Sequence, residues 1–79
     1  MPIRVELSRL LRKYVSDYDE DHGILVDYEE GKTVGHVIAE LDIPREKVFT
    51  VFVNRKPSKV GARLRDGDLV ALALILGAG

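Results

Sequence analysis

The chain has 79 residues, of which 46% are hydrophobic and 32% charged, and its formal net charge at pH 7 is −1. This size predicts one small domain, 1–79, with little room for a deep cleft and a complete catalytic apparatus. There is no cysteine, which excludes a disulfide framework, thiolate metal sites and a cysteine nucleophile. The longest apolar run is far shorter than the roughly 20 residues of a membrane helix, and the first apolar residues alternate with charges, unlike a secretory signal. We therefore expect a soluble, cytoplasmic protein that does not bind a membrane.

Charge is distributed unevenly along the chain. The segment 17–30 carries acidic residues and no Lys or Arg, whereas 55–65 carries Lys and Arg and no acidic residue. Blocks of this kind are most often solvated faces, although they also steer charged partners. The basic block has no interleaved aromatic residue to stack on bases, so nucleic-acid binding is not expected.

The first half of the chain predicts a strand, a short helix and a second strand. In "PIRVEL" three aliphatic residues alternate with charged ones, which is the pattern of a half-buried strand. Ser8 is a suitable N-cap for a short helix that extends to about Val15. The acidic stretch 17–22 is expected to be a loop. "GILVDYEEG" is expected to be a strand that a turn at Gly31 brings back beside the first.

The second half predicts the main helix and two strands. Thr33 is a suitable N-cap, and Pro44 is expected to end the helix because proline disfavours helical geometry in the residue before it. Aliphatic residues recur between them at helical spacing, namely Val34, Val37, Ile38 and Leu41. "VFTVFVN" is β-branched and aromatic, which suits a central strand. "RDGD" is a strong turn signal before the last strand, "LVALALIL".

Two strands, a crossover helix and two further strands fit a mixed sheet with the amphipathic helix packed across one face. This arrangement is the β-grasp, an α+β fold of two layers. The core is then expected to join the helix residues Val37, Ile38 and Leu41 to the sheet residues Val5, Val51, Val53 and Leu72.

Two stretches look like ligand-binding loops but lack required residues. "EGKT", at 30–33, lies between a strand and a helix, but Val26 occupies the position at which a phosphate-binding loop needs glycine. "DYDEDHG" has aspartates at alternating positions, yet His22 stands where a calcium loop needs glycine, and Tyr28 stands where it needs glutamate. We therefore expect a helix cap in the first stretch and an acidic surface loop in the second.

No arrangement of side chains predicts catalysis or metal binding. His22 and His36 are far apart in the sequence without matching ligands, and His36 falls on the polar side of the predicted helix. No nucleophile with a base and no general acid–base pair stands out. We expect no metal site, no intrinsic cofactor and no enzyme activity.

The chain ends in "LILGAG", which passes from aliphatic side chains into small ones. Gly79 offers a carboxylate with little steric cover on a permissive backbone, and a flexible tail 76–79 would reach on the order of 13 Å beyond the sheet. That reach suits a partner's active site, where the carboxylate could be activated as an acyl-adenylate from ATP and converted by sulfide to a thiocarboxylate. Taken alone, the tail fits simple fraying better.

The rest of the sequence favours a functional tail over simple fraying. "VFVNRKPSKVGARLRDGDLVALALILGAG" resembles the C-terminal half of the small ubiquitin-like sulfur carriers, in which a "VxVN" strand, a "LxDGDxVxL" turn and strand and a small-residue terminus recur in this order. "TVGHVIAELDIP" resembles their crossover helix, and "IRVELSRLLRKY" resembles the opening of the molybdopterin synthase small subunit. The resemblance covers nearly the whole chain. It implies a β-grasp fold and sulfur carriage on a C-terminal thiocarboxylate.

By this resemblance Gly79 is the site of adenylation and of the thiocarboxylate, and Gly77 and Ala78 lead into it. The partners implied are a ubiquitin-activating-like adenylating enzyme, which uses ATP and Mg²⁺, and a sulfur acceptor such as the large subunit of molybdopterin synthase. Carriers of this family usually end in Gly-Gly, whereas this chain has Ala78 before its last glycine.

The pathway and two other functions remain open. Leu74 and Ile75 replace the Pro-Pro pair common in the molybdopterin type, and the two tail glycines look closer to the thiamine-pathway carrier. The first helix nevertheless favours molybdopterin biosynthesis. The alternatives are a β-grasp interaction module without carrier chemistry, for which Ala78 is the motive, and a protein modifier joined to lysines through Gly79.

Overall fold

A computed structural model describes residues 2–74 of the chain. The elements, with η for 3-10 helices, are β1 (Ile3–Leu7), η1 (Arg9–Tyr14), β2 (Ile24–Val26), α1 (Val34–Glu40), η2 (Arg45–Lys47), β3 (Thr50–Val53), β4 (Lys56–Pro57) and β5 (Leu69–Ala73). The predicted elements occur in the predicted order, but η2 and the fifth strand, β4, which lies where a turn was expected, were not predicted. The tail residues 75–79 lie outside the described residues, and so do the predictions of a flexible segment 76–79 and of a site at Gly77, Ala78 and Gly79.

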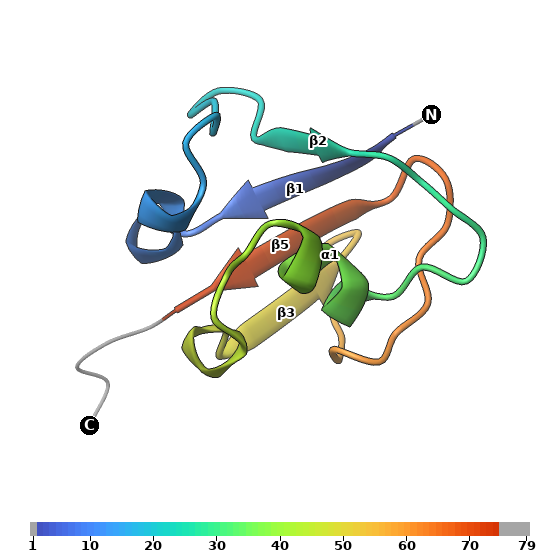
Figure 1. The fold of residues 1–79 in the computed structure, drawn as a ribbon. Helices are drawn as coiled ribbons and strands as arrows, with labels where there is room; N and C mark the ends of the chain where they lie inside the picture. The colour runs from blue at the N-terminus through green and yellow to red at the C-terminus, as the bar shows by residue number, and fades with distance from the viewer. Residues whose placement is uncertain (1, 75–79) are drawn as a thin grey trace.

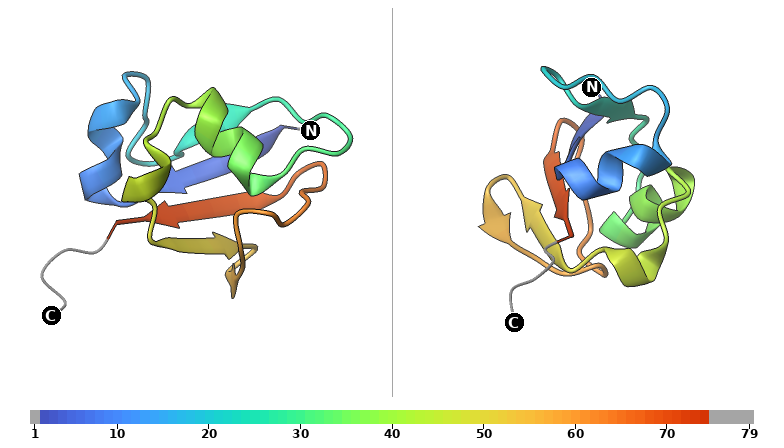
Figure 2. Two further views of the ribbon diagram at one scale, coloured as in Figure 1. Left: turned by 60° about the horizontal axis from the view of Figure 1, so that its bottom comes forward. Right: turned by 90° about the vertical axis from the view of Figure 1, so that its left-hand side faces the viewer.

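The five strands form one mixed sheet in the order β2-β1-β5-β3-β4. β5 lies in the middle, parallel to β1 and antiparallel to β3, while β2 and β4 pair antiparallel with β1 and β3 at the two edges. The "VFTVFVN" strand β3 therefore lies next to the middle, between β5 and the two-residue β4. Figures 1 and 2 show α1 crossing the sheet. The predicted α+β β-grasp fold is confirmed.

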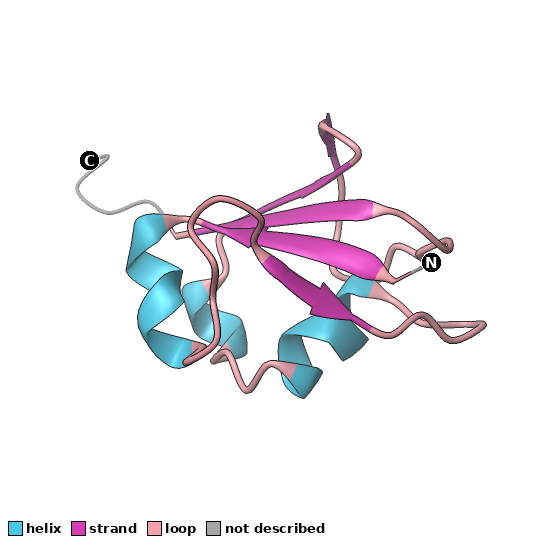
Figure 3. Ribbon diagram, turned by 90° about the horizontal axis from the view of Figure 1, so that it is seen from above, coloured by secondary structure: helices cyan, strands magenta, loops and turns pink. Residues whose placement is uncertain are grey.

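All three helical segments lie on one side of the sheet, and no described helix covers the other face (Figure 3). Along β1 and β5 the residues that face the helices are buried and alternate with more exposed ones. The sheet is thus half-buried, as an alternating pattern requires. The core consists of Ile3, Val5, Leu7, Leu11, Val26, Val34, Val37, Ile38, Ile43, Val51, Leu64, Val70 and Leu72.

The predicted helix face is the buried one. Val37 and Ile38 are 0% and 1% exposed, and the sheet residues expected to meet them, Val5, Val51 and Leu72, belong to the same buried core. Leu41 and Val53 pack against this core but are only partly buried. The reason for Leu41 is that α1 ends at Glu40, which leaves Leu41 as the C-cap beyond the last helical turn.

The helix begins as predicted and ends earlier. The Thr33 hydroxyl accepts a hydrogen bond from the His36 N–H at 3.2 Å, and the Thr33 N–H donates to His36 Nδ1 at 3.0 Å, so the two residues form a reciprocal cap. Asp42 has a φ of 57°, a left-handed conformation that short polar residues tolerate. The chain therefore leaves the helix before Pro44, which precedes η2 instead.

The short helix after Ser8 has the predicted extent, whereas the second strand is shorter than predicted. The short helix after Ser8 is a 3-10 helix, and β2 covers only three residues of "GILVDYEEG". β2 begins after Gly23, whose φ is 73° and whose missing Cβ would lie 2.4 Å from the main-chain oxygen of Val5. In the "RDGD" turn, Gly67 has a φ of 85°, and the Arg65 N–H donates to the Asp68 carboxylate at 2.7 Å. Both glycines are thus required by the backbone.

The different burial of Ile38 and Leu41 predicts different costs of truncation. Ile38→Ala should lower the free energy of unfolding by about 2–5 kcal/mol because it removes a fully buried side chain. Leu41→Ala should cost about 1–2 kcal/mol, since part of this side chain already contacts water. Urea denaturation of both variants measures the difference. Equal losses would contradict the partial burial of Leu41.

Candidate functional site at the tail exit

Three hydrogen bonds hold the end of β5, from which the tail departs. The Ser8 N–H donates to the main-chain oxygen of Leu72 at 2.9 Å, and the Phe49 N–H donates to that of Ala73 at 2.9 Å. The Leu74 N–H donates to Ser8 Oγ at 3.0 Å. The last described residues are therefore fixed on both flanks, by the β1–η1 junction and by the η2–β3 junction. We call this arrangement of Ser8, Phe49 and residues 72–74 the tail exit.

The Ser8 side chain makes a contact that the sequence pattern does not predict. Ser8 occupies the N-cap position of η1, as expected, but its side chain makes no capping hydrogen bond. Its hydroxyl instead contacts Leu74, 66 positions away in the sequence. A serine before a helical segment is a strong local signal for a cap, so this contact could only be found from the fold.

The side chains of Arg12 and Tyr18 bind the main chain at the end of β1, next to the tail exit. β2 pairs with β1 only as far as Val5, so that the outward main-chain groups of Leu7 have no strand partner. The Tyr18 hydroxyl accepts from the Leu7 N–H at 3.1 Å, and Arg12 Nε donates to the Leu7 oxygen at 3.0 Å. Arg12 also stacks over the Tyr18 ring and pairs with Glu20 at 3.2 Å. The loop before β2 is thereby fastened beside the tail exit.

The tail exit has a hollow on one side and an exposed aromatic ring on the other. A hollow of about 410 Å³ is lined by residues of β1, η1, β5 and the loop before β2, among them Leu72 and Ala73, and by Ser8 at the β1–η1 junction. Phe49, which pairs with the end of β5, is 66% exposed. A single exposed apolar residue is ordinary on a protein surface, so Phe49 is of interest only because it adjoins the end of β5. The hollow and the exposed ring make the tail exit a candidate contact surface.

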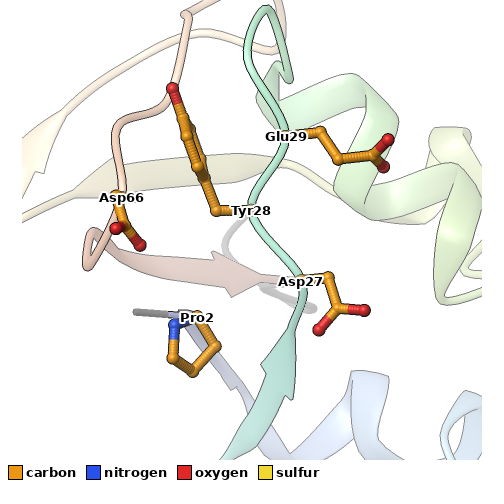
Figure 4. Close-up of a pocket in the computed structure, with 5 residues that line it drawn as sticks. All are labelled: Pro2, Asp27, Tyr28, Glu29 and Asp66. Carbon is orange, nitrogen blue, oxygen red and sulfur yellow. The ribbon is translucent and has the colours of Figure 1, made fainter.

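Another hollow, of about 750 Å³, lies at the opposite end of β1 and β5, beside Pro2 and the turn before β5. Its carboxylates belong to Asp27, Glu29 and Asp66, and Figure 4 shows that they point in different directions rather than toward one centre. Among residues 2–74, no group of three or more His, Asp or Glu side chains has an arrangement that could hold a metal ion. This hollow gives no support for a ligand site.

The two loop-like stretches are occupied by internal contacts. Lys32 of "EGKT" is buried, and its ammonium donates to the main-chain oxygen of Asp27 and to Glu40, both at 2.6 Å. In "DYDEDHG", Asp19 Oδ1 accepts from the N–H groups of Asp21 and His22 at 2.7 and 3.2 Å. These bonds, led by that from Asp21, lower the pKa of the Asp19 carboxyl below its ordinary value. Lysine and aspartate therefore stabilise their own loops.

The Lys32–Glu40 contact yields a test of this interpretation. Glu40→Ala should lower the free energy of unfolding by about 1–3 kcal/mol, because a lysine side chain that is 5% exposed loses its carboxylate partner. Glu46→Ala is the matched control, since Glu46 is exposed on η2 and should change the free energy by less than about 0.5 kcal/mol. Similar values for both variants in urea denaturation would show that the Lys32–Glu40 pair contributes little.

A mixed sheet of this order, with a helix across one face and the last strand in the middle, defines the ubiquitin-like class of β-grasp proteins. Within that class the chain belongs to the Mut7-C ubiquitin family, whose model matches residues 1–73. The crystal structure of SAMP1 from Haloferax volcanii is similar, with a TM-score of 0.72 over 100% of both chains at 18% sequence identity. Among curated proteins, no sequence matches this chain.

The ubiquitin-like relationship expected from the sequence motifs is thus confirmed. The family match ends before the tail, so the roles of Gly77, Ala78 and Gly79 stay predictions. Along residues 2–74 there is no helix of the length and hydrophobicity needed to span a membrane.

Proposed function

We propose that the protein is a sulfur carrier whose C-terminal carboxylate, on Gly79, is adenylated by a partner enzyme and then converted to a thiocarboxylate. The observation that carries this proposal is the held end of β5, the middle strand of a ubiquitin-like fold, together with the sequence that follows it, which has glycine at position 79. Fully extended, residues 75–79 would span about 17 Å. That length suits a buried active site in another protein.

The chemistry needs no catalytic side chain from this chain. A carboxylate oxygen of Gly79 attacks the α-phosphorus of ATP, which releases pyrophosphate and forms an acyl-adenylate. A sulfide sulfur then attacks the acyl carbon and displaces AMP, which leaves the thiocarboxylate. The partner binds ATP and Mg²⁺, and Gly77 and Ala78 contribute a narrow lead with little side-chain volume. On this proposal the protein is not itself an enzyme.

The proposed pathway is molybdopterin biosynthesis, with the large subunit of molybdopterin synthase as sulfur acceptor. The support is the opening strand and short helix of the chain, which resemble those of the synthase small subunit. Thiamine biosynthesis is the alternative, supported by Gly77 and Gly79 in the tail. The interaction module and the lysine-linked modifier differ from both in their products, since the module gains no sulfur and the modifier forms larger covalent adducts.

The carrier hypothesis predicts a defined change of mass. Incubation with the adenylating enzyme of the source organism, ATP and sulfide should exchange one carboxylate oxygen for sulfur, which intact-protein mass spectrometry detects. Gly79→Val should abolish pyrophosphate exchange because the side chain blocks the approach to the terminal carboxylate, while the circular dichroism spectrum stays unchanged. Ala78→Gly is the control, since removing a methyl group should leave exchange nearly unchanged. Undiminished exchange in Gly79→Val would refute the proposal.

The partner should also contact the tail exit. Phe49→Ala should raise the KM of the adenylating enzyme for this protein about tenfold, because exposed aromatic residues near a binding site often contribute about 1–2 kcal/mol. Its own unfolding free energy should change little, since the ring is 66% exposed. Leu25→Ala is the matched control, because Leu25 is 59% exposed but lies on edge strand β2. An equal effect of both substitutions would exclude a specific contact at the tail exit.

A further inference from the structure

Ser8 lies where β1 ends and η1 begins, so its main-chain oxygen could accept a hydrogen bond either from β5 or from η1. Its N–H donates to the oxygen of Leu72, which continues the parallel ladder between β1 and β5. In a regular parallel ladder the next bond would run from the Leu74 N–H to the main-chain oxygen of Ser8. That oxygen instead accepts from the Leu11 N–H at 2.9 Å, because the chain has turned into η1. The ladder would therefore end one bond early.

The Ser8 hydroxyl replaces the missing acceptor. Oγ lies 3.0 Å from the Leu74 nitrogen, so the side chain of Ser8 accepts the bond that its main-chain oxygen cannot. Phe49 holds the opposite flank of β5 through Ala73. Leu74 is the last residue that the structure describes, and its N–H is bonded to the sheet through the side chain of Ser8.

We propose that Ser8 is a positioning residue for the tail, which fixes the backbone at Leu74 and so sets the point and direction from which residues 75–79 enter the partner. This inference rests on the proposed carrier function. A tail that starts from a fixed residue loses less conformational freedom when it enters a narrow channel than a tail whose first residue must also be ordered. The Ser8–Leu74 bond is expected to persist in the complex both before and during adenylation. Its contribution is therefore to binding rather than to the chemical step.

On this proposal, few residue types can replace serine at position 8. It must be short, and it must carry an acceptor one bond beyond Cβ, which serine and threonine do and alanine does not. Threonine also suits the extended backbone of Ser8, with φ −64° and ψ 159°. Ser8→Ala and Ser8→Thr therefore form a pair in which only the second keeps the bond to Leu74.

Amide hydrogen exchange tests the bond itself without any partner. Protection of the Leu74 amide, measured by NMR, should fall about three- to tenfold in Ser8→Ala, the change expected for the loss of one ordinary hydrogen bond. Ser8→Thr should retain it. The Asn54 amide, which donates to the Leu69 oxygen at 2.8 Å near the other end of β5, should keep its protection in both variants. Unchanged protection of Leu74 in Ser8→Ala would overturn the inference.

Pyrophosphate exchange with the adenylating enzyme of the source organism tests the positioning role. Ser8→Ala should raise the KM for this protein about three- to tenfold with kcat unchanged, and Ser8→Thr should restore the wild-type KM. A purely structural role would lower the unfolding temperature while leaving the KM unaltered at temperatures where the variant is folded, and that result would overturn the inference. If the wild-type chain supported no exchange, the carrier function would fail and positioning with it. Loss of protection at Leu74 in Ser8→Ala would still establish the hydrogen bond.

Discussion

The parallel pairing of β1 with β5 is the constraint on which the rest of the structure depends. It joins Arg4–Leu7 to residues 69–72, so that the first and last strands of the chain form the centre of the sheet. Parallel neighbours need a long crossover connection, and α1 lies on that connection and covers the face where Val5 and Val70 are fully buried. Because both strands point the same way, the end of β5 lies beside the β1–η1 junction.

The elements whose buried stripe is a local property of the sequence could be predicted. β1 and α1 have apolar residues at the period of their structure, and the buried side of each is the one that the pattern indicates. β5 is apolar on both faces in the sequence, so its existence but not its buried face could be predicted. Boundaries that depend on neighbours could not be predicted in this way. β2 stops after Val26 although apolar and polar residues continue, and the helix ends at Glu40 because Asp42 takes a left-handed conformation. Pro44 is the stronger local signal, but it acts one segment later.

In the candidate site, local sequence patterns also failed to identify the partners of two polar side chains. Ser8 has the local pattern of a cap and Lys32 that of a phosphate-loop lysine, yet each contacts a residue that no local pattern identifies. A polar group that is removed from water must find a partner, and among residues 2–74 no buried side-chain nitrogen or oxygen lacks one. The partner is chosen by the fold, because Leu74 is brought to Ser8 only by the β1–β5 pairing. Sequence alone therefore locates the tail but not what holds it.

The topology of the sheet also determines where the acidic and basic segments of the sequence lie relative to the tail exit. β2 and β4 form opposite edges of the sheet, so that the acidic loop before β2 lies far from Lys56 in β4. The end of the basic segment 55–65 returns beside the helix start, where the Leu64 N–H donates to the Lys32 oxygen at 2.8 Å and Arg63 pairs with Thr33. β2 runs antiparallel to β1, which places the acidic loop before β2 at the end from which the tail departs. Long-range fields of this kind orient a protein as it approaches a charged surface. On the proposed function, the acidic loop would therefore be a charged surface near the partner that receives the tail, whereas the basic segment follows β3 at the other end of the sheet, where the Asn54 N–H donates to the Leu69 oxygen.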